Sequence, residues 1–325
     1  MSGTLELRAW DILKLLSNGG FHSGETMAQH LQVSRATVHN DLIEIEAAGI
    51  AVQRIHGKGY RLTQPWQPLD EHAIHIALAD VAVRFDVQVQ GQATSSNALL
   101  LQRAAQGAPS GSVLAVELQT AGRGRLGRIW HSSLGNALTF SVLWRFDCGL
   151  NALSGLSLAV GLAIVRALQR VGLPNAGLKW PNDVMASGAK LGGVLLEAQG
   201  DMLGPCAVVI GIGLNCSLPL HLEQRIDQSA TALDQLVDEM PSRNDLLAAL
   251  LQELAKVLDE FSQQGFAGMA GDWQRHHVRQ DEHITLNMPD GSKVQGMARG
   301  VNGRGELLLE TAGGLQTFNS GEVGL

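Results

Sequence analysis

A short glycine- and arginine-rich segment, Gly122-Arg-Gly-Arg-Leu-Gly-Arg128, directly follows the strand-like run 112–119. Glycine lets the backbone adopt left-handed dihedral angles and approach a ligand closely. Arginine supplies paired donors that match phosphate or carboxylate oxygens. A strand that leads into such a loop predicts an anion-binding site beside a β-sheet, although a glycine-rich run alone is equally compatible with a flexible surface loop.

A second charged segment lies further along the chain, where Lys179-Trp-Pro-Asn-Asp183 is followed by Lys190-Leu-Gly-Gly193. The residues between them predict a hairpin that turns at Ser187-Gly188. A turn centred there puts Asp183 opposite Gly192 and brings both lysines into the same short ribbon. Because a buried lysine is costly without a partner, this grouping indicates a site that handles charge. The alternative is an ordinary exposed hairpin with solvated lysines.

With both segments in view, the chain resembles the biotin protein ligase family, specifically the bifunctional members that also repress the biotin operon. Each motif is weak alone, but the ordered set is specific and covers nearly the whole chain. Where the family often has threonine this chain has Ser96, which keeps the hydroxyl, and Leu126 stands where some members have a second arginine. The motifs are Ser95-Ser96-Asn97, Gln119-Thr-Ala-Gly-Arg-Gly-Arg-Leu-Gly-Arg128 with Trp130, the two lysine segments with Glu197, Gly211-Ile-Gly-Leu-Asn215 and Ser320-Gly-Glu-Val323.

Length and charge limit the possible organisation. A chain of 325 residues predicts two or three domains, and 45% hydrophobic residues suffice for their cores. The net charge of -7 argues against a surface that binds nucleic acid or anionic membrane everywhere. Any contact with DNA is therefore expected to be local.

The cysteines and the hydropathy indicate a compartment. Cys148, Cys206 and Cys216 lack the close paired spacing of a zinc site, so they favour a reducing interior over a disulfide framework. Neither a signal peptide over residues 1–10 nor an uncharged run of membrane-spanning length is visible. We expect a soluble, cytoplasmic protein without a membrane partner.

Residues 1–64 predict a winged helix-turn-helix domain. A first amphipathic helix stops at residues 18–20, Ser23 is expected to cap a short helix, and Ser34 a longer helix that ends at Gly49. Two strand-like runs, 52–55 and 60–63, flank a hairpin tip that contains Lys58 and forms a candidate wing.

The helix after Ser34 is the candidate recognition helix. Val38, Leu42 and Ile45 share one face and are expected to pack inward. Residues 1–65 hold six Lys/Arg and six Asp/Glu, so one copy should bind DNA only weakly without dimerisation. A small helical domain for protein contacts is the alternative. The predicted DNA contacts are Arg35, Thr37, His39, Asn40 and Lys58.

The rest of the chain predicts an α+β multidomain protein. Residues 65–80, with Pro65 and Pro68, form a linker, and residues 81–273 alternate strand-like and helical runs around a mixed sheet. No Rossmann or Walker pattern is present, and the resemblance implies the biotin/lipoate ligase framework related to class II aminoacyl-tRNA synthetases. Residues 274–325 contain short, regularly spaced strands, in keeping with the SH3-like C-terminal barrel of the family.

The chemistry implied by the resemblance has two steps. Biotin's carboxylate does not react with amines, so it must first form a mixed anhydride with AMP, which a lysine of an acceptor protein then attacks. Neither step needs an enzyme nucleophile. Both need cancellation of charge, alignment of the reacting groups and exclusion of water, which lysine, arginine and backbone amides can provide.

The resemblance also assigns roles to residues. Catalysis falls to Lys190, which would contact the carboxylate and α-phosphate, with Arg125 and with Asp183, which would aid the acceptor amine or bind Mg²⁺. Trp180 is expected to be a core aromatic. The expected biotin-binding residues are Ser95, Ser96, Asn97, Gln119, Gly122, Arg123, Arg125, Lys190 and Gly193, and those for ATP or adenylate are Arg123, Arg125, Arg128, Trp130, Lys179, Asn182, Lys190 and Asn215.

The implied ligands are biotin, ATP and Mg²⁺. The implied partners are the biotin carboxyl carrier protein of acetyl-CoA carboxylase, operator DNA and, in the ligand-bound state, a second copy of the chain. Two alternatives remain at this stage. One is a ligase for another acyl group such as lipoate, and the other is a transcription regulator whose middle domain only senses ligand.

Overall fold

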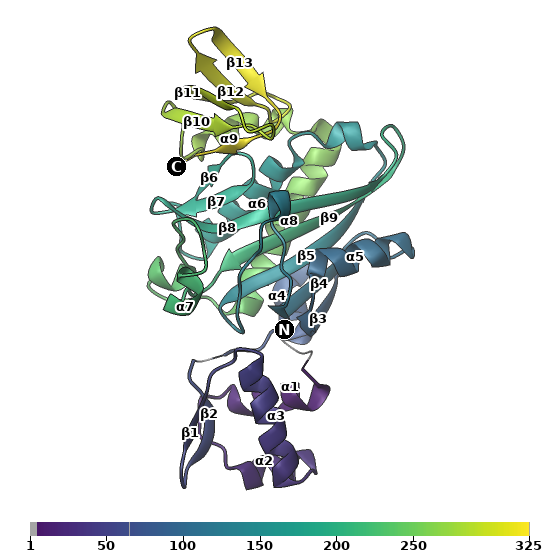
Figure 1. The fold of residues 1–325 in the computed structure, drawn as a ribbon. Coiled ribbons are helices and arrows are strands. Elements are labelled where there is room, and N and C mark those ends of the chain that lie inside the picture. Colours follow the sequence, from purple (N-terminus) through teal and green to yellow (C-terminus); the bar gives the residue numbers. More distant parts are fainter. Residues whose placement is uncertain (1–4, 65, 325) are drawn as a thin grey trace.

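The computed structural model describes residues 5–64 and 66–324, except for the side chain of His221, so Pro65 of the predicted linker lies outside the described residues. Figure 1 shows three bodies arranged in a row, with a helical N-terminal body at one end and a β-rich C-terminal body at the other. Between them lies a large body built on a mixed sheet. The predicted multidomain α+β fold is confirmed.

The N-terminal body is a helix-turn-helix with a small hairpin. Its elements are α1 (Leu7–Leu16), α2 (Gly24–Leu31), α3 (Arg35–Ala47), β1 (Val52–Ile55) and β2 (Gly59–Leu62). The Ser23 side chain accepts a hydrogen bond from the Thr26 amide and that of Ser34 from the Thr37 amide, so both predicted N-caps are confirmed. Val38, Leu42 and Ile45 are buried, as expected for the inner face of α3.

The central sheet has seven strands in the order β3-β4-β5-β9-β8-β7-β6, and only β3 and β4 pair in parallel. The short helix α4 (Glu71–Leu78) and the 3-10 turn η1 (Ala79–Arg84) lead into it. Its strands are β3 (Asp86–Ala93), β4 (Ser112–Gln119), β5 (Ala137–Phe146), β6 (Gly177–Lys179), β7 (Asp183–Ala186), β8 (Ala189–Gly200) and β9 (Cys206–Asn215).

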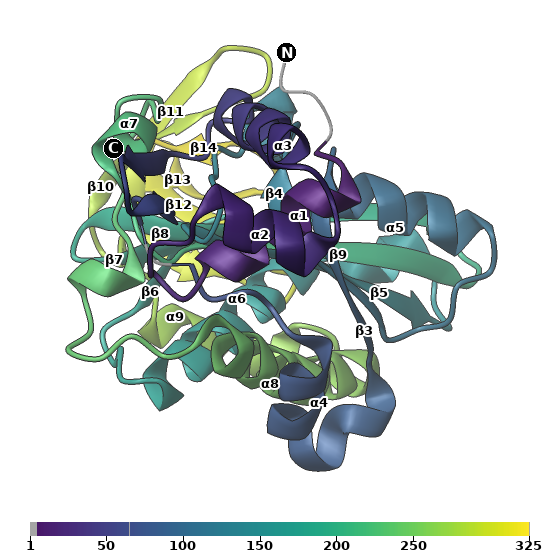
Figure 2. The same ribbon diagram turned by 90° about the horizontal axis from the view of Figure 1, so that it is seen from below.

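Helices cover both faces of this sheet because its strands are apolar on both sides. On β4, Val113 and Ala115 belong to the main core, whereas Leu114 and Val116 pack with residues of α5 (Ser96–Ala105). The main core is completed by α6 (Leu156–Arg170) and α8 (Arg243–Gln264). Figure 2 shows α8 beside α4 and far from α5. Shorter elements are α7 (Leu220–Glu223), α9 (Ala270–Arg275), η2 (Arg125–Gly127), η3 (Leu150–Leu153), η4 (Leu233–Gln235) and η5 (Ala267–Met269).

The C-terminal body is an antiparallel sheet in the order β13-β12-β11-β10-β14. Trp180, fully buried as predicted, ties it to the central body by donating from Nε1 to the Gly305 carbonyl at 3.0 Å. The backbone of Leu178 on the edge strand β6 also bonds to His276 and Val278. The strands are β10 (His283–Asn287), β11 (Lys293–Val301), β12 (Leu307–Thr311), β13 (Gly314–Phe318) and β14 (Glu322–Val323).

The predicted hairpin at Ser187-Gly188 is present, with Ala186 opposite Ala189, but its register differs from the expectation. Asp183 pairs with Gly193 rather than with Gly192, because the ladder shifts by one residue between Val184 and Met185. A bulge of this kind redirects side chains near a site. Among the described residues, no helix is long and apolar enough to cross a membrane.

Candidate active site

One pocket of about 640 Å³ opens where the central sheet meets the arginine loop (residues 122–128) and the C-terminal body. Its wall also includes the segment 225–230 and, from the C-terminal body, Asn287 and Glu322. Gly122 is not on the wall. The predicted ligand residues that line the pocket are Ser95, Ser96, Asn97, Gln119, Arg123, Arg125, Arg128, Trp130, Lys179, Asn182, Asp183, Lys190, Gly193 and Asn215.

The pocket wall contains a charge cluster of three residues. The Asp183 carboxylate lies 2.6 Å from Lys190 Nζ and 3.1 Å from Lys179 Nζ, and all three side chains are largely buried. Burial by itself would raise the pKa of the Asp183 carboxyl, but the charges of the two lysines outweigh it and lower that pKa. With two ammonium groups and one carboxylate, the cluster keeps one positive charge that faces the pocket.

A hydrogen-bond network of hydroxyl and amide groups, tied to the Glu197 carboxylate, forms part of the pocket wall. The Ser96 amide donates to Gln119 Oε1 at 2.8 Å, which joins the start of α5 to the end of β4. The buried Ser141 on β5 bonds to Ser96 Oγ and Asn97 Oδ1, and Asn97 Nδ2 donates to Glu197 at 2.9 Å. These hydroxyl and amide groups can form hydrogen bonds with a polar, uncharged ligand.

Two glycines of the Gly211-Ile-Gly-Leu-Asn215 motif make room for site side chains. A Cβ at Gly211 would lie 2.2 Å from Asn97 Oδ1, and one at Gly213 would lie 2.7 Å from the Trp130 indole. Gly122, which is not on the pocket wall, makes room for Trp130 as well, because a Cβ at Gly122 would lie 2.7 Å from the Trp130 carbonyl oxygen. These contacts explain why β9 carries glycine on the side that faces the ligand.

The arginine loop folds back on itself, with the Gly124 amide donating to the Arg128 carbonyl at 2.8 Å. Its three guanidinium groups have three different partners. Arg123 pairs with Glu197 at 2.7 Å, Arg128 pairs with Glu322 of the C-terminal body, and Arg125 donates to the Asn182 amide oxygen at 3.2 Å. Burial lowers the pKa of Arg125, against the opposing charges of Glu322 and Asp183. The loop's charge is therefore held by side chains from outside the loop.

The pocket also contains residues that the motifs do not include, chiefly Arg225 and His131. Arg225 belongs to a segment that is anchored at Lys190, whose amide donates to the Ser229 carbonyl at 3.0 Å. Burial and the charge of Arg225 lower the pKa of His131, while Asp227 opposes them. The backbone bond between Lys190 and Ser229 joins segments that are far apart in the sequence, and such a bond leaves no local sequence pattern.

Asp183 is the residue predicted to bind Mg²⁺. Each of its carboxylate oxygens already faces a lysine ammonium group. Among the described residues, no group of three or more His, Cys, Asp or Glu side chains is placed to bind a metal ion. The residues around Asp183 do not fit a resident magnesium site.

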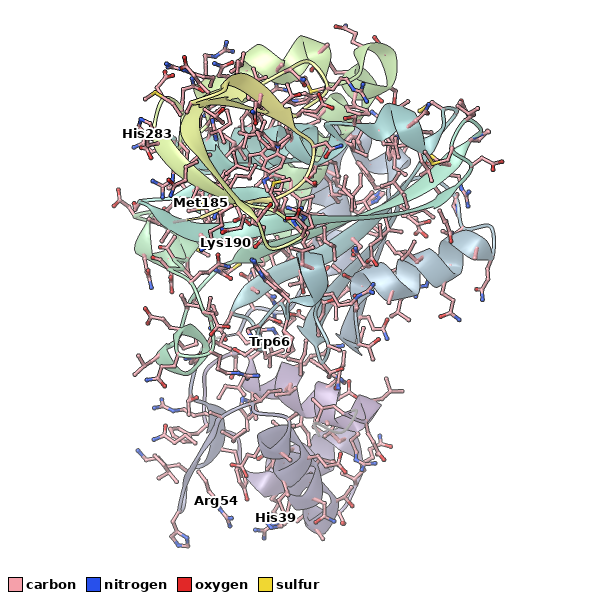
Figure 3. All side chains as sticks on the ribbon, turned by 45° about the horizontal axis from the view of Figure 1, so that its top comes forward. His39, Arg54, Trp66, Met185, Lys190 and His283 are labelled. Atoms are coloured by element: carbon pink, nitrogen blue, oxygen red, sulfur yellow. The ribbon has the colours of Figure 1, made fainter. Side chains whose placement is uncertain are left out.

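The predicted DNA contacts lie at the far end of the N-terminal body. Arg35, His39 and Asn40 of α3 are exposed, Thr37 is half-buried beside Ser34, and Lys58 stands at the hairpin tip. Arg54, which the sequence analysis did not include, lines a hollow with His39. Figure 3 shows His39 and Arg54 together at this end, with Trp66 lying between them and Lys190.

Comparisons with known proteins agree with this architecture. Three family models match: an HTH domain over residues 8–61, the biotin/lipoate A/B protein ligase family over residues 89–215 and the biotin protein ligase C-terminal domain over residues 281–325. Bifunctional ligase/repressor BirA of Salmonella typhimurium is 34% identical over 97% of this chain and 96% of its own. The biotin--[acetyl-CoA-carboxylase] ligase of Mycobacterium tuberculosis is 35% identical over 79% of this chain and 95% of its own.

A solved structure of a biotin protein ligase matches most of this chain. The biotin protein ligase from Aquifex aeolicus, in complex with biotin and ATP, superposes with a TM-score of 0.62 at 28% identity, over 74% of this chain and 97% of its own. Identity above 30% along almost the entire length of a relative, together with the three family models in order, decides the assignment. This chain belongs to the BirA family of bifunctional ligase/repressors.

Proposed function

We propose that this chain converts biotin and ATP into biotinyl-5'-AMP and then biotinylates one lysine of the biotin carboxyl carrier protein of acetyl-CoA carboxylase. The observation that carries the proposal is that one pocket combines the net positive cluster of Lys179, Asp183 and Lys190 with the uncharged polar groups around Asn97 and with the arginine loop. This combination suits a ligand with an uncharged ureido ring, a carboxylate and a triphosphate. The Aquifex relative, whose structure contains biotin and ATP, supports the same choice.

In the first step a carboxylate oxygen of biotin attacks the α-phosphorus of ATP, and the bond from that phosphorus to the pyrophosphate oxygen breaks. We expect Lys190 to contact both reacting groups, because its side chain lines the pocket from β8, close to Gly193 of the same strand. A fixed cation there stabilises the charge that gathers on the phosphate oxygens. Arg123, Arg125 and Arg128 would close over the nucleotide.

In the second step the acceptor lysine attacks the acyl carbon and AMP leaves with both electrons of the acyl–oxygen bond. The attacking amine must lose a proton, and Asp183 is the nearest carboxylate to Lys190. Its two lysine neighbours lower its pKa after burial has raised it, so Asp183 is better suited to orient the amine than to hold its proton. We expect Mg²⁺ to arrive on the ATP phosphates and not on Asp183.

The experiment is incubation of the protein with ATP, Mg²⁺, a carrier domain and either biotin or lipoate, followed by intact mass measurement. The acceptor should gain one biotin, and only when ATP is present. Equal or better transfer of lipoate would replace biotin by lipoate in the proposal. A protein that binds biotin but forms no adenylate would instead be a sensor without ligase activity.

The second half of the proposal is repression of biotin synthesis genes by a ligand-bound homodimer on operator DNA. One N-terminal body has a balanced charge and offers few phosphate contacts, so useful affinity should need two copies on two half-sites. Ligand would act by binding the dimer-competent form more tightly. We expect this to take place in the cytoplasm, where ATP and chromosomal DNA are found together.

The test is sedimentation with and without biotin plus ATP, alongside footprinting of the DNA upstream of the biotin genes. Ligand should increase both the dimer fraction and the DNA affinity, and His39→Ala should lower the DNA affinity without changing the dimer fraction. A protein that stays monomeric with unchanged DNA affinity would remove the repressor half and leave the ligase half intact.

A further inference from the structure

The pocket wall carries six lysine and arginine side chains, and their partners differ. Lys179 and Lys190 share Asp183, while Arg123 and Arg128 pair with glutamates. Arg125 donates to the neutral amide of Asn182. Arg225 remains, and within residues 5–64 and 66–324 its side chain has no ion pair or hydrogen bond. A guanidinium group without a partner on the wall of a charged pocket is available to an incoming anion.

The backbone around Arg225 is fixed from both sides, although its side chain is exposed. On one side its amide donates to the Leu222 carbonyl at 3.0 Å, and Leu222 and Ile226 belong to a small apolar cluster. On the other side Thr231 and Ser229 bond to the backbone of Lys190 at 2.9 and 3.0 Å. The segment that carries Arg225 is therefore attached directly to the strand that carries Lys190.

Lys190 marks the reacting centre, so the position of Arg225 indicates which part of the ligand it would meet. The network of Ser96, Asn97 and Gln119, where the ureido ring is proposed to bind, joins α5, β4 and β5, whereas the segment of Arg225 is bonded to Lys190 of β8. Arg225 and His131 both line the pocket, and the backbone bonds of Ser229 and Thr231 to Lys190 hold the segment of Arg225 beside the proposed reacting centre. The adenylate has a single phosphate, which Lys190 and the arginine loop can serve. The β- and γ-phosphates need additional positive charge.

We infer that Arg225 binds the β- and γ-phosphates of ATP, so that it helps to hold the substrate and leaves contact when pyrophosphate departs. This inference rests on the proposed adenylation of biotin. A planar guanidinium group can donate two parallel hydrogen bonds to phosphate oxygens, and its neutral replacement cannot. Arg225 thus differs from Arg125, whose proposed role is to retain the adenylate after pyrophosphate has left.

The experiment compares Arg225→Gln, Arg225→Lys and the control Arg304→Gln, an exposed arginine of the C-terminal body that is not on the pocket wall. Calorimetry with biotin present measures the affinity for a non-hydrolysable ATP analogue and for AMP. Loss of hydrogen bonds to charged phosphates should weaken analogue binding by about ten- to a hundredfold in Arg225→Gln. Binding of AMP should stay unchanged, and Arg225→Lys should recover part of the loss.

Two results would overturn the inference. Unchanged analogue affinity in Arg225→Gln would remove Arg225 from the site, and equal weakening of AMP and analogue would move its contact to the adenosine or α-phosphate. If the proposed function is wrong, the unaltered protein will show no biotin-dependent exchange of pyrophosphate into ATP. Analogue binding is measured without catalysis, so the two failures are distinguishable.

Discussion

Two buried charge clusters lie at different places on the central sheet, and they differ in balance. At the joint with the N-terminal body, Glu117 of β4 pairs with Arg243 of α8 at 2.6 Å, and both side chains are almost fully buried. Glu117 also accepts from the Leu69 amide and the Trp66 indole, while Arg243 donates to the carbonyls of Gln67 and Ala137. This cluster is neutral, and its hydrogen-bonding groups are occupied by residues 66–69 and by the Ala137 carbonyl of β5.

The cluster of Lys179, Asp183 and Lys190 has two cations for one anion and opens on the pocket. A neutral, saturated pair has nothing left to offer a ligand, so its role is to fix the linker against the sheet. An unbalanced cluster keeps a positive charge for which only a ligand can supply the partner. The difference indicates that charge balance, more than burial, separates a binding site from a structural ion pair.

Breaking the neutral cluster should have the largest effect on stability. Arg243→Met leaves Glu117 buried without its cation, and we expect the free energy of unfolding to fall by about 3–5 kcal/mol. Urea denaturation followed by fluorescence measures this change. The double variant Glu117→Leu with Arg243→Met should lose less than the sum of the single variants, because no buried charge is then left unpaired. Additive losses would contradict the comparison.

Removing a cation from the unbalanced cluster should affect chemistry instead. Lys190→Ala leaves Lys179 and Asp183 as a neutral pair, so the urea midpoint should change little. The rate of adenylate formation should fall by the equivalent of about 2–4 kcal/mol, typical of a lost charge contact in the transition state. Single-turnover measurement with biotin and ATP checks it, and Lys293→Ala, in the C-terminal body away from the pocket, is the control. Normal adenylation in Lys190→Ala would remove it from the catalytic residues.

The sequence predicted local structural features better than contacts between distant segments. Features set by neighbouring residues were found correctly, such as the Ser23 and Ser34 caps, the inner face of α3 and the turn at Ser187-Gly188. The register beyond that turn was wrong by one residue, because the bulge between Val184 and Met185 follows from pairing across the sheet and not from the turn. Local chemistry therefore predicted elements better than their alignment.

Two contacts over long sequence separations were not predicted. The Ser229 carbonyl accepts from the Lys190 amide and so holds the segment of Arg225 at the pocket, and Glu117 meets Arg243, away from the pocket, across 126 residues of sequence. Neither contact has a fixed spacing that a motif could record. The charged residues to which ligand roles are assigned do line the pocket, and their roles are left to experiment.

A third kind of buried group is an ionisable side chain that forms no ion pair within the part of the chain that the structure describes. His277 is buried against Trp273, with ring centroids 4.7 Å apart, where the central and C-terminal bodies join. Burial lowers the pKa of His277 to about 4, and the charge of Arg279 acts in the same direction. Gln280 and Glu282 raise this pKa but only partly offset the effect. The folded protein therefore keeps this ring neutral.

The expected consequence is a loss of stability in acid. Above the unfolded pKa of about 6.5 the ring is neutral in both states, so His277 adds no pH dependence there. As the pH falls from about 6.5 towards about 4 the unfolded state binds the proton first, and stability should fall by about 2–3 kcal/mol from this residue. Urea midpoints across that range should vary less for His277→Gln than for the unaltered protein. His283→Gln, at an exposed site in the same body, is the control, and equal pH dependence in all three proteins would count against the assignment.

The smallest expected effect concerns a cation that has no carboxylate partner and lies on a loop. Within residues 5–64 and 66–324, Arg125 donates only to the Asn182 amide and has no ion pair, so Arg125→Ala should leave the urea midpoint unchanged. We expect adenylate formation to stay near normal and escape of biotinyl-AMP to become about tenfold faster, as for one lost hydrogen bond to a charged group. Trapping of released adenylate after a single turnover measures this rate. If Arg125→Ala slowed formation as much as Lys190→Ala does, the loop and the strand cluster would share one role, and charge balance would no longer distinguish them.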